Sequence, residues 1–341
     1  MNKNNFLNYI KGKSILITGG TGSFGNFFTK TILKKYYSQI KKIVIYSRDE
    51  LKQTTMQNKI DPKKRDKVRF FIGDVRDKQR LEQALEGIDI AIHAAALKHV
   101  PIAETNPFEF IKTNILGAQN IVDASIKNNL KNVIALSTDK AVSPINLYGA
   151  TKLVSDKIFT SANLMVGNRN LKFSVVRYGN VFGSRGSVVP IFLGNKSNTL
   201  DITHKDMTRF NITVKDAIEM VFWSLTNNIG GEVFIPKIKS YRILDLAKAV
   251  NNKSKINFIG IRPGEKIFEE LISKADSFNT YDLKKYYSIV EKNLNKTLKY
   301  YKLKKFKKVP LNFEYNSSNN PNFLNVNQLH KLINDFKKEI V

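Results

Sequence analysis

The chain has 341 residues, an apolar fraction of 42% and no cysteine, so it can bury a large core but cannot form disulfides, thiolate metal sites or cysteine nucleophiles. Its net charge of +27 is scattered and no nucleic-acid motif accompanies it. No apolar run approaches the ~20 residues that cross a bilayer. We therefore expect a soluble, cytoplasmic protein that binds neither nucleic acid nor membrane.

The first half of the chain alternates short apolar runs with helical patterns. We expect strands at 14–18, 42–46, 68–72, 88–93, 132–137 and 172–177, and helices at 24–36, 78–86, 114–128 and 148–162. Continuous apolar strands separated by helices predict an α/β fold built on a Rossmann-type doubly wound parallel sheet with both faces covered.

After residue 180 the alternation weakens and the elements shorten, which predicts a smaller C-terminal α/β lobe. We expect the Rossmann domain to comprise residues 1–178 with a returning segment at about 212–236. Residues 179–211 and 237–341 are expected to form a lobe that binds the substrate. Within that lobe, the lysine-rich segment 292–312 suggests no function by its sequence.

A glycine-rich turn lies between the first predicted strand and the helix that follows it. Gly19, Gly22 and Gly25 have the spacing of dinucleotide-binding loops. In such loops glycine permits a tight turn, lets the backbone approach a pyrophosphate and lets the helix pack on the strand. The helix N-terminus then offers N–H groups to the phosphates. The sequence therefore predicts a dinucleotide cofactor.

The end of the second predicted strand selects between the two nicotinamide dinucleotides. An acidic side chain there suits the ribose 2′-OH of NAD, whereas Arg suits the 2′-phosphate of NADP. Ser47, Arg48 and Lys52 fit a phosphate, so we expect NADP. Asp49 keeps NAD open as an alternative.

The ends of the third and fourth strands also face this site. Asp74 and Val75 are placed to meet the adenine, although a plain turn is the alternative interpretation. The small residues 94–96 are expected beside the nicotinamide ribose. His93, at the strand end, is more typical of a hydrogen-bonded core residue than of a catalytic one, and we assign it no catalytic role.

Two pairs of residues indicate proton transfer. Tyr148 and Lys152 are four residues apart and so share one face of a helix, where Lys can hold the cofactor ribose and lower the pKa of the phenol. Asp139 and Lys140 follow the fifth strand, at the edge where such sheets bind ligands. A simple alcohol dehydrogenase needs no adjacent acid and amine there, so this pair indicates further chemistry rather than a surface ion pair.

Four blocks of sequence resemble the extended short-chain dehydrogenase/reductase superfamily. They are STDKAVSPINLYGATK at 137–152, RYGNVFGSRGSVVP at 177–190, MTRF at 207–210 and IRPGEK at 261–266. Within the superfamily they resemble the inverting UDP-N-acetylglucosamine 4,6-dehydratases of the pseudaminic acid pathway, over about residues 6–290 and again at 316–333. Configuration-retaining relatives typically have Met in place of Tyr148 and carry transmembrane helices, which favours the inverting branch. The stretch 190–207 is shorter than the family pattern.

The resemblance implies a hydro-lyase that converts UDP-N-acetylglucosamine to UDP-2-acetamido-2,6-dideoxy-β-L-arabino-hex-4-ulose. Tyr148, helped by Lys152, would remove the 4-OH proton while NADP takes hydride from C4. Lys140, neutral because burial and Lys152 lower its pKa, would take the C5 proton, and protonated Asp139 would donate to the departing 6-hydroxyl. After hydride returns to C6, Tyr148 would protonate C5 from the opposite face.

Larger sets of residues are expected to surround the two ligands. Those expected at the cofactor are Gly19, Thr21, Gly22, Ser23, Phe24, Gly25, Ser47, Arg48, Lys52, Asp74, Val75, Ala94, Ala95, Ala96, Lys98, Asn114, Tyr148, Lys152 and Val181. The substrate contacts that the resemblance implies are Lys98, Thr138, Tyr148, Asn180, Arg185, Arg209, Arg262 and Glu265. Arg suits the diphosphate through its bidentate fork. We expect no metal site and a homo-oligomer.

Three alternatives stay open from the sequence. The first is a retaining 4,6-dehydratase. The second is a nucleotide-sugar 4-epimerase, which would use Tyr148 and Lys152 but would not need the pair at 139 and 140. The third is a non-catalytic NADP-binding regulator, against which the intact proton-transfer residues argue.

Overall fold

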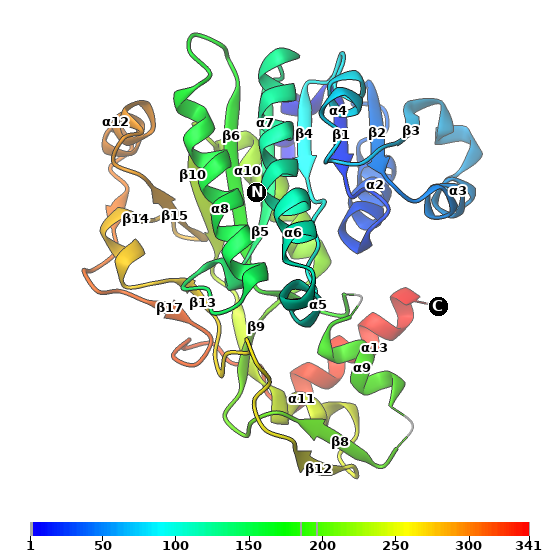
Figure 1. The fold of residues 1–341 in the computed structure, drawn as a ribbon, viewed down its shortest axis with the longest axis vertical. Coiled ribbons are helices and arrows are strands. Elements are labelled where there is room, and N and C mark those ends of the chain that lie inside the picture. The colour runs from blue at the N-terminus through cyan, green and yellow to red at the C-terminus, as the bar shows by residue number, and fades with distance from the viewer. Residues whose placement is uncertain (1–2, 185, 196, 341) are drawn as a thin grey trace.

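A ten-stranded sheet forms the centre of the molecule in the computed structural model, which describes residues 3–184, 186–195 and 197–340 (Figure 1). The strand order is β16-β14-β15-β10-β6-β5-β4-β1-β2-β3, and the run from β10 to β3 is parallel. The parallel strands are β1 Ser14–Thr18, β2 Lys42–Ser47, β3 Val68–Ile72, β4 Ile90–His93, β5 Asn132–Thr138, β6 Lys172–Tyr178 and β10 Glu232–Pro236. This is the order of a doubly wound dinucleotide-binding sheet, so the predicted fold class is confirmed.

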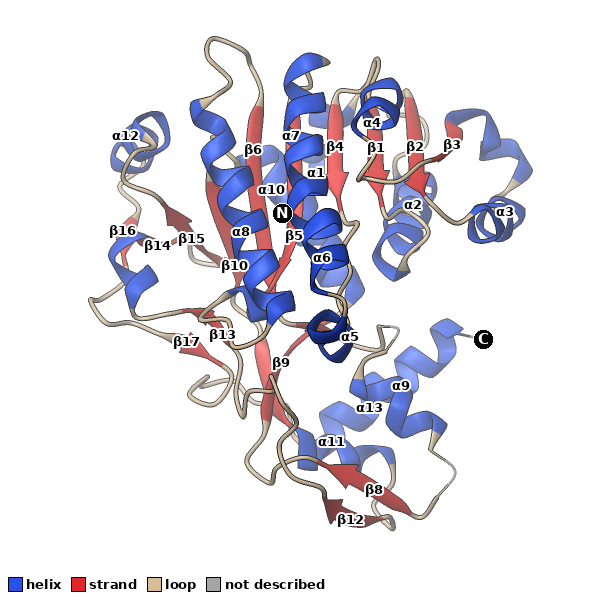
Figure 2. Cartoon of the chain, in the orientation of Figure 1, coloured by secondary structure: helices blue, strands red, loops and turns tan. Residues whose placement is uncertain are grey.

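Helices cover both faces of the sheet (Figure 2). One layer packs its apolar side chains on the first face and consists of α1 Lys3–Ile10, α2 Ser23–Lys35, α3 Glu50–Asn58 and α10 Val214–Asn227. The opposite layer consists of α4 Lys78–Ala84, α7 Gly117–Lys127 and α8 Leu147–Ser161. Because both faces are covered, every residue of β1 is buried, which explains the continuous apolar runs in the sequence.

The sheet continues beyond β10 through antiparallel strands. These are β15 Tyr286–Val290, β14 Thr280–Asp282 and the edge strand β16 Lys307–Lys308, with α12 Asn295–Leu303 between β15 and β16 in the chain. The sequence predicts this part of the chain to belong to the substrate lobe, whereas its strands pair in the main sheet. The lysine-rich segment 292–312 therefore lies at the sheet edge. The boundaries of the substrate lobe stay a prediction.

A smaller lobe lies beyond the carboxyl ends of the parallel strands, in the lower part of Figure 1. Its strands are β7 Asn180–Val181, β9 Thr208–Ile212 and β11 Lys239–Arg242 in one sheet, β8 Thr199–Ile202 with β12 Lys255–Phe258, and β13 Glu270–Ile272 with β17 Tyr315–Asn316. Around a separate apolar cluster pack α9 Val188–Gly194, α11 Ile243–Val250 and α13 Val326–Ile340. The stretch 190–207, which is shorter than the family pattern, thus contains most of α9 and all of β8.

Short helices connect β4 to α7 beside the carboxyl edge of the sheet. They are α5 Val100–Thr105, α6 Pro107–Phe110 and the π-helical turn η2 Ile111–Leu116. The helix expected at 114–128 therefore begins as a π turn and becomes α-helical only at Gly117. Within the part of the chain that the structure describes, no helix is both long enough and apolar enough to span a membrane.

Candidate active site

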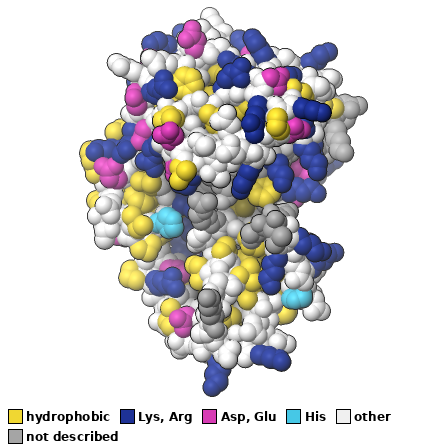
Figure 3. All heavy atoms as spheres, turned by 90° about the vertical axis from the view of Figure 1, so that its right-hand side faces the viewer, with side chains coloured by type: hydrophobic (Ala, Val, Ile, Leu, Met, Phe, Trp, Pro, Cys, Tyr) yellow, Lys and Arg dark blue, Asp and Glu magenta, His cyan; other side chains and the backbone are white. Residues whose placement is uncertain are grey.

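A cavity of about 1230 Å³ lies between the carboxyl ends of the parallel strands and the smaller lobe. The glycine loop, the ends of β2, β4 and β5 and residues of the smaller lobe all line it, so the two predicted sets of ligand contacts share one space. Doubly wound sheets bind their ligands at this edge. On the face drawn in Figure 3, Lys and Arg side chains are dispersed rather than gathered in one block, in agreement with the scattered charge of the sequence.

The glycine loop between β1 and α2 leaves no room for larger side chains. Gly19 has a φ of +63°, and a Cβ added there would lie 2.9 Å from the backbone of Ala95. A Cβ at Gly25 would lie 2.3 Å from the carbonyl oxygen of Gly20, so α2 packs directly on the loop. The N-cap of α2 is Gly22, which has no side chain to cap the first N–H groups of the helix. This loop fits the pyrophosphate of a nicotinamide dinucleotide.

The turn from β2 into α3 carries the residues on which the predicted choice of NADP over NAD rests. The Asp49 carboxylate accepts a hydrogen bond from Lys52 N at 2.9 Å and pairs with the Lys52 ammonium, so it caps α3. The Arg48 guanidinium lies 3.6 Å from Asp74, and its side chain is 53% exposed. Both Arg48 and Ser47 line the cavity. Asp49 also lines the cavity, but its carboxylate is engaged by its own helix.

His93 has the hydrogen-bonded core environment that its sequence context indicates. It is buried, and its Nδ1 lies 3.0 Å from Thr18 Oγ1. The same Thr18 oxygen accepts the N–H groups of Ala94 and Ala95 at 3.2 Å. Burial, with a smaller contribution from Lys152, lowers the pKa of His93 to about 3, so the imidazole is neutral. These hydrogen bonds hold the turn at Ala94 and Ala95, which follows β4, against the glycine loop.

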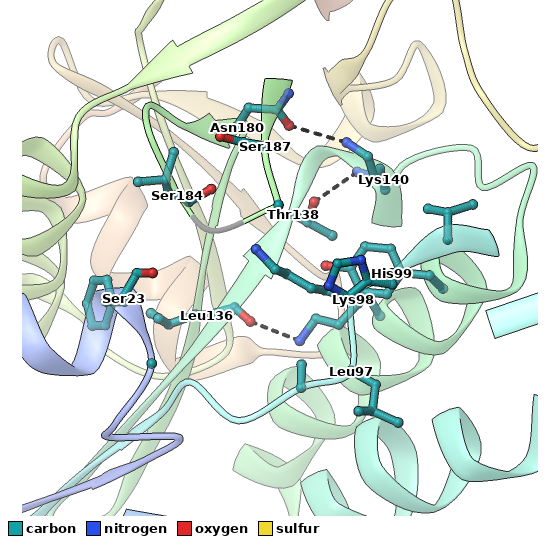
Figure 4. A pocket seen from close by; sticks show the side chains of 18 of the residues that line it. Ser23, Leu97, Lys98, His99, Leu136, Thr138, Lys140, Asn180, Ser184 and Ser187 are labelled. Atoms are coloured by element: carbon teal, nitrogen blue, oxygen red, sulfur yellow. Dashed lines mark hydrogen bonds between the residues drawn. The ribbon is translucent and has the colours of Figure 1, made fainter. Parts of the chain in front are cut away.

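Tyr148 and Lys152 lie on α8, and both side chains are buried and line the cavity. The first turn of α8 is capped by Asn146, whose Oδ1 accepts a hydrogen bond from Gly149 N at 2.8 Å. Lys152 Nζ donates to the carbonyl oxygen of Leu136 at 2.9 Å, at the end of β5 (Figure 4). The cap and the strand contact therefore fix the pair at the carboxyl edge of the sheet.

The acidity of the Tyr148 phenol differs from the sequence prediction. Burial raises the pKa of Tyr148 to about 12, although the Lys140 charge and a hydrogen bond with Thr138 act in the opposite direction. The sequence predicts that Lys152 lowers this pKa. Instead, the Lys152 ammonium is directed at the Leu136 carbonyl, and burial lowers its own pKa. The phenol is therefore protonated at neutral pH in this structure.

Lys140 lies between two buried carboxylates, on the 3-10 turn η3 Asp139–Ala141. Its Nζ is 3.1 Å from Asp139 Oδ1 and 3.0 Å from Glu269 Oε1, and it donates to Asn180 Oδ1 at 3.4 Å (Figure 4). Burial disfavours the ammonium, but the two carboxylates outweigh burial and raise the pKa of Lys140. The predicted lowering of this pKa is therefore wrong, because the prediction did not include Glu269.

Asp139 is fully buried behind Lys140. Its Oδ1 accepts hydrogen bonds from Thr138 Oγ1 at 3.0 Å and from Lys140 Nζ at 3.1 Å, whereas its Oδ2 has no partner among the described residues. A Cβ added at Gly179 would lie 3.1 Å from this Oδ2, so the carboxylate packs against that glycine. Burial raises the pKa of Asp139, which favours the protonated acid that the predicted chemistry requires.

The cavity brings most of the predicted site residues together. Of the predicted catalytic residues, Lys140, Tyr148 and Lys152 line it, whereas Asp139 lies behind Lys140 and does not. The predicted cofactor residues that line it are Gly19, Thr21, Gly22, Ser23, Phe24, Gly25, Ser47, Arg48, Lys52, Asp74, Val75, Ala94, Ala95, Ala96, Lys98, Tyr148, Lys152 and Val181. Asn114 is not among the lining residues. Its side-chain amide donates to the Leu97 carbonyl at 2.9 Å and to Thr151 Oγ1 at 3.0 Å. These bonds hold Leu97, which lines the cavity, against α8.

The predicted substrate contacts come mainly from the smaller lobe. Those that line the cavity are Lys98, Thr138, Tyr148, Asn180, Arg209, Arg262 and Glu265, whereas Arg185 lies outside the described residues. Arg209, on β9, is held by donating to the carbonyl oxygens of Thr208 at 2.7 Å and Ile267 at 3.1 Å. The other two nitrogens of this guanidinium, Nη2 and Nε, lie 3.6 Å from Glu265 and 3.7 Å from Glu269, so its position at the cavity wall is fixed from several sides.

Glu269, just before β13, is a cavity residue that the sequence does not predict. Its side chain is only 3% exposed, and besides Lys140 it lies 3.7 Å from Arg209 Nε. The adjacent Glu270 instead pairs with Lys266 at 3.4 Å. Two consecutive Glu residues look alike in the sequence, and only the tertiary fold separates the one that faces the cavity.

Comparison with known proteins places the chain among sugar-nucleotide enzymes. Residues 15–291 match the model of the polysaccharide biosynthesis protein family. The chain is 50% identical over 332 residues to a UDP-N-acetylglucosamine 4,6-dehydratase (inverting) of Campylobacter jejuni, covering 95% of this chain and 98% of the relative. It is 40% identical over 328 residues to a UDP-glucose 4-epimerase of Rickettsia akari, covering 94% and 95%.

Solved structures of other proteins share the fold of this chain. Pen from Bacillus thuringiensis superposes with a TM-score of 0.86 at 34% identity, over 96% of this chain and 99% of that chain. DesIV, a dTDP-glucose 4,6-dehydratase from Streptomyces venezuelae solved with NAD and TYD, has a TM-score of 0.66 at 21% identity, over 74% and 86%, and supports the fold alone.

The doubly wound sheet, the glycine loop and the Tyr148–Lys152 pair define an enzyme of the short-chain dehydrogenase/reductase class, built for a nicotinamide cofactor. The family follows from the match over most of the chain and from the 50% identity. The chain belongs to the polysaccharide biosynthesis protein family and, within it, to the inverting UDP-N-acetylglucosamine 4,6-dehydratases.

Proposed function

We propose that this protein removes water from UDP-N-acetylglucosamine and inverts C5, giving UDP-2-acetamido-2,6-dideoxy-β-L-arabino-hex-4-ulose, with NADP as its cofactor. The observation that carries the proposal is the position of Lys140, held against buried Asp139 and facing the same cavity as Tyr148 and Lys152. The Tyr–Lys pair alone can serve the oxidation of a sugar hydroxyl. Elimination of water needs a further acid and base, which the pair at 139 and 140 supplies.

The cofactor end of the cavity supports NADP. When bound, NADP would accept a hydride from C4 and return it to C6, so the reaction has no net redox change. The glycine loop would hold the pyrophosphate, and Arg48 with Ser47 would hold the 2′-phosphate. The capping of α3 by Asp49 supports this choice, because that carboxylate would otherwise suit the 2′-OH of NAD.

The substrate end of the cavity supports a nucleoside diphosphate sugar. Arg209 and Arg262, with Lys98, line it and provide cations for the diphosphate. Glu265 lies 3.6 Å from Arg209 and orients that guanidinium. The sugar would then extend toward Thr138, Lys140 and Tyr148, at the end of β5.

Oxidation at C4 requires removal of the proton on the 4-hydroxyl group. Tyr148 would take this proton as phenolate, and Lys152 would move from the Leu136 carbonyl to the cofactor ribose and the phenol. Because the pKa of Tyr148 is raised to about 12 by burial, the phenolate depends on nearby positive charge, of which Lys140 is one source.

Elimination follows from the 4-keto group, which makes the proton on C5 acidic. Lys140, after passing its own proton to the Asp139 carboxylate to which it is hydrogen-bonded, would take the C5 proton. Asp139 lies behind Lys140 and does not line the cavity, so the Asp139 proton would reach the departing 6-hydroxyl group by way of the Lys140 amine. One proton leaves the sugar and one is added to the leaving group, so water departs without a change in charge. Tyr148 would finally deliver a proton to C5 from the opposite face, which inverts that centre.

Mass spectrometry of UDP-N-acetylglucosamine incubated with the purified protein tests the function. We expect a product that has lost one molecule of water. The second candidate, a nucleotide-sugar 4-epimerase, has support from the 40% identity to the Rickettsia relative, and it would give a new epimer of unchanged mass. NMR of the sugar distinguishes that epimer from an unaltered substrate of the same mass, and an unaltered substrate would leave only a non-catalytic NADP-binding role.

We also propose that the chain works in the cytoplasm as a homo-oligomer and that its product serves pseudaminic acid biosynthesis. Ile102 on α5, Phe108 on α6 and Leu116 on η2 are between 49% and 59% exposed, although they are large and apolar. Such side chains on consecutive elements support a subunit interface. Light scattering of the purified protein should give a mass above that of one chain.

A further inference from the structure

A buried carboxylate outside the predicted catalytic set contacts the amine that we assign to C5 chemistry. Glu269 Oε1 lies 3.0 Å from Lys140 Nζ, slightly closer than Asp139 Oδ1 at 3.1 Å. The Glu269 side chain also lines the cavity, whereas Asp139 lies behind Lys140. Lys140 is therefore held from two sides, and Glu269 is the carboxylate on the cavity side.

The fold fixes the backbone of Glu269 through the C-terminal segment. Glu269 N donates to Ser317 Oγ at 3.0 Å, and Ser317 N donates to the Glu269 carbonyl at 2.8 Å. The Ser317 hydroxyl also lies 2.8 Å from Thr208 Oγ1, next to Arg209 in the chain. One serine thus joins the segments that carry Glu269 and Arg209, so the position of the carboxylate is built into the tertiary structure.

Stability alone does not account for this ion pair. Burying two charges is costly, and well-packed apolar side chains of similar volume are often as stabilising as a buried pair. Glu269 Oε2 also has no hydrogen-bond partner among the described residues, although it is buried. A carboxylate with one unsatisfied oxygen in a substrate cavity is more typical of a functional site than of a structural pair.

We propose that Glu269 is a positioning residue for the dehydration, which holds Lys140 Nζ at the cavity wall as an ammonium and sets the pH above which Lys140 can take the C5 proton. This inference rests on the proposed function. Glu269 itself does not exchange a proton with the sugar in this scheme, and it acts only through Lys140.

The charged and titratable groups around Lys140 come from several elements. They are Asp139 on η3, Tyr148 on α8, Arg209 on β9, Tyr241 on β11 and Glu269 before β13. Arg209 opposes the ammonium, and burial raises the pKa values of both Tyr148 and Tyr241. The two carboxylates are thus the groups in this set that favour the ammonium, and Asp139 is itself driven toward its neutral form by burial. Of the two carboxylates, Glu269 therefore keeps its negative charge more readily.

The sign of the expected effect follows from this arrangement. Lys140 must be neutral to act as a base, so the rate of dehydration should rise with pH as the ammonium loses its proton. Removing the charge of Glu269 takes away one of two anions that favour the ammonium, so Lys140 should lose its proton at lower pH. An opposite charge at this distance typically shifts a pKa by about 1–3 units.

The test compares the pH dependence of dehydration in three variants of the full-length protein. Glu269→Gln keeps the shape of the side chain without its charge, Glu269→Asp keeps the charge on a shorter side chain, and Glu270→Gln is the matched control on the adjacent residue. For each, kcat and KM for UDP-N-acetylglucosamine are measured across the stable pH range, together with the affinity for NADP.

We expect the rising part of the kcat profile of Glu269→Gln to move to lower pH by about one unit or more, with little change in KM or NADP affinity. Glu269→Asp should keep the wild-type position of the rise with a lower kcat, and Glu270→Gln should match the wild type. A profile of Glu269→Gln that keeps the wild-type position, or a shift in Glu269→Asp as large as in Glu269→Gln, overturns the inference. A wild-type protein that releases no water overturns the proposed function as well.

Discussion

Replacing Lys140 by Met tests the buried charge cluster directly. Lys140 lies between Asp139 and Glu269, whose side chains are 0% and 3% exposed, and Met keeps an apolar stem without the charge. Removing one partner of a buried ion pair costs about 3–5 kcal/mol, because the other charge stays buried without a partner. The Lys140 side chain is 24% exposed and Arg209 remains 3.7 Å from Glu269, so we expect a loss near the lower end, about 3 kcal/mol.

The free energy of unfolding is measured by urea denaturation of the single variants Lys140→Met and Glu269→Gln and of the double variant. The double variant should be more stable than the sum of the single losses predicts, by ~1 kcal/mol or more, because the second change removes an unpaired charge. The loss in the free energy of unfolding that Lys140→Met causes should become smaller as the pH falls. Without the cation the folded-state pKa values of the carboxylates rise above their unfolded values, so the folded state binds more protons and gains stability at low pH. Additive losses, or a deficit that grows in acid, would refute the charge pairing.

Three further substitutions test the cofactor, the inversion and the packing of the site. Arg48→Asp should reverse the preference from NADP to NAD in equilibrium binding, while Lys59→Asp at the end of the same helix should leave it unchanged; equal affinities in the wild type would contradict the assignment. Tyr148→Met should slow dehydration by ~10²-fold or more, with residual product shifted toward the D-xylo form by NMR, and normal formation of L-arabino product would remove Tyr148 from C5 protonation. Gly149→Ala places a Cβ 2.2 Å from the Lys140 carbonyl oxygen, so it should lower turnover and should lower the free energy of unfolding by about 1–3 kcal/mol. Gly194→Ala is the control, because its added Cβ would have no atom within 4 Å, and it should be tolerated.

The Rossmann half of the fold could be predicted because its signals are local. The buried strands read as continuous apolar runs, and the glycine turn at Gly19 lies between a strand and a helix in both the sequence and the structure. The antiparallel extension beyond β10 could not be predicted as part of the same sheet. Its strands β14 and β16 are short and carry polar residues, and their pairing depends on contacts between distant segments.

In the candidate site, too, local features could be predicted from the sequence, whereas contacts between distant segments could not. The Tyr148–Lys152 pair and the Asp139–Lys140 pair are recognisable because each lies within one local element. The directions of the pKa shifts of Lys140 and Tyr148 were not predictable, because they depend on burial and on Glu269, which reaches the site from the smaller lobe. Sequence identifies the reactive groups here, whereas the tertiary fold decides their protonation.

The central claim is that this protein eliminates water across C5 and C6 and inverts C5. NMR of the product formed from UDP-N-acetylglucosamine in D₂O, recorded from the earliest time points, tests it most directly. We predict a 4-keto, 6-deoxy sugar of the L-arabino configuration that carries solvent deuterium at C5. A D-xylo product from the first time points would contradict the inversion, and a product of unchanged mass would contradict the dehydration itself.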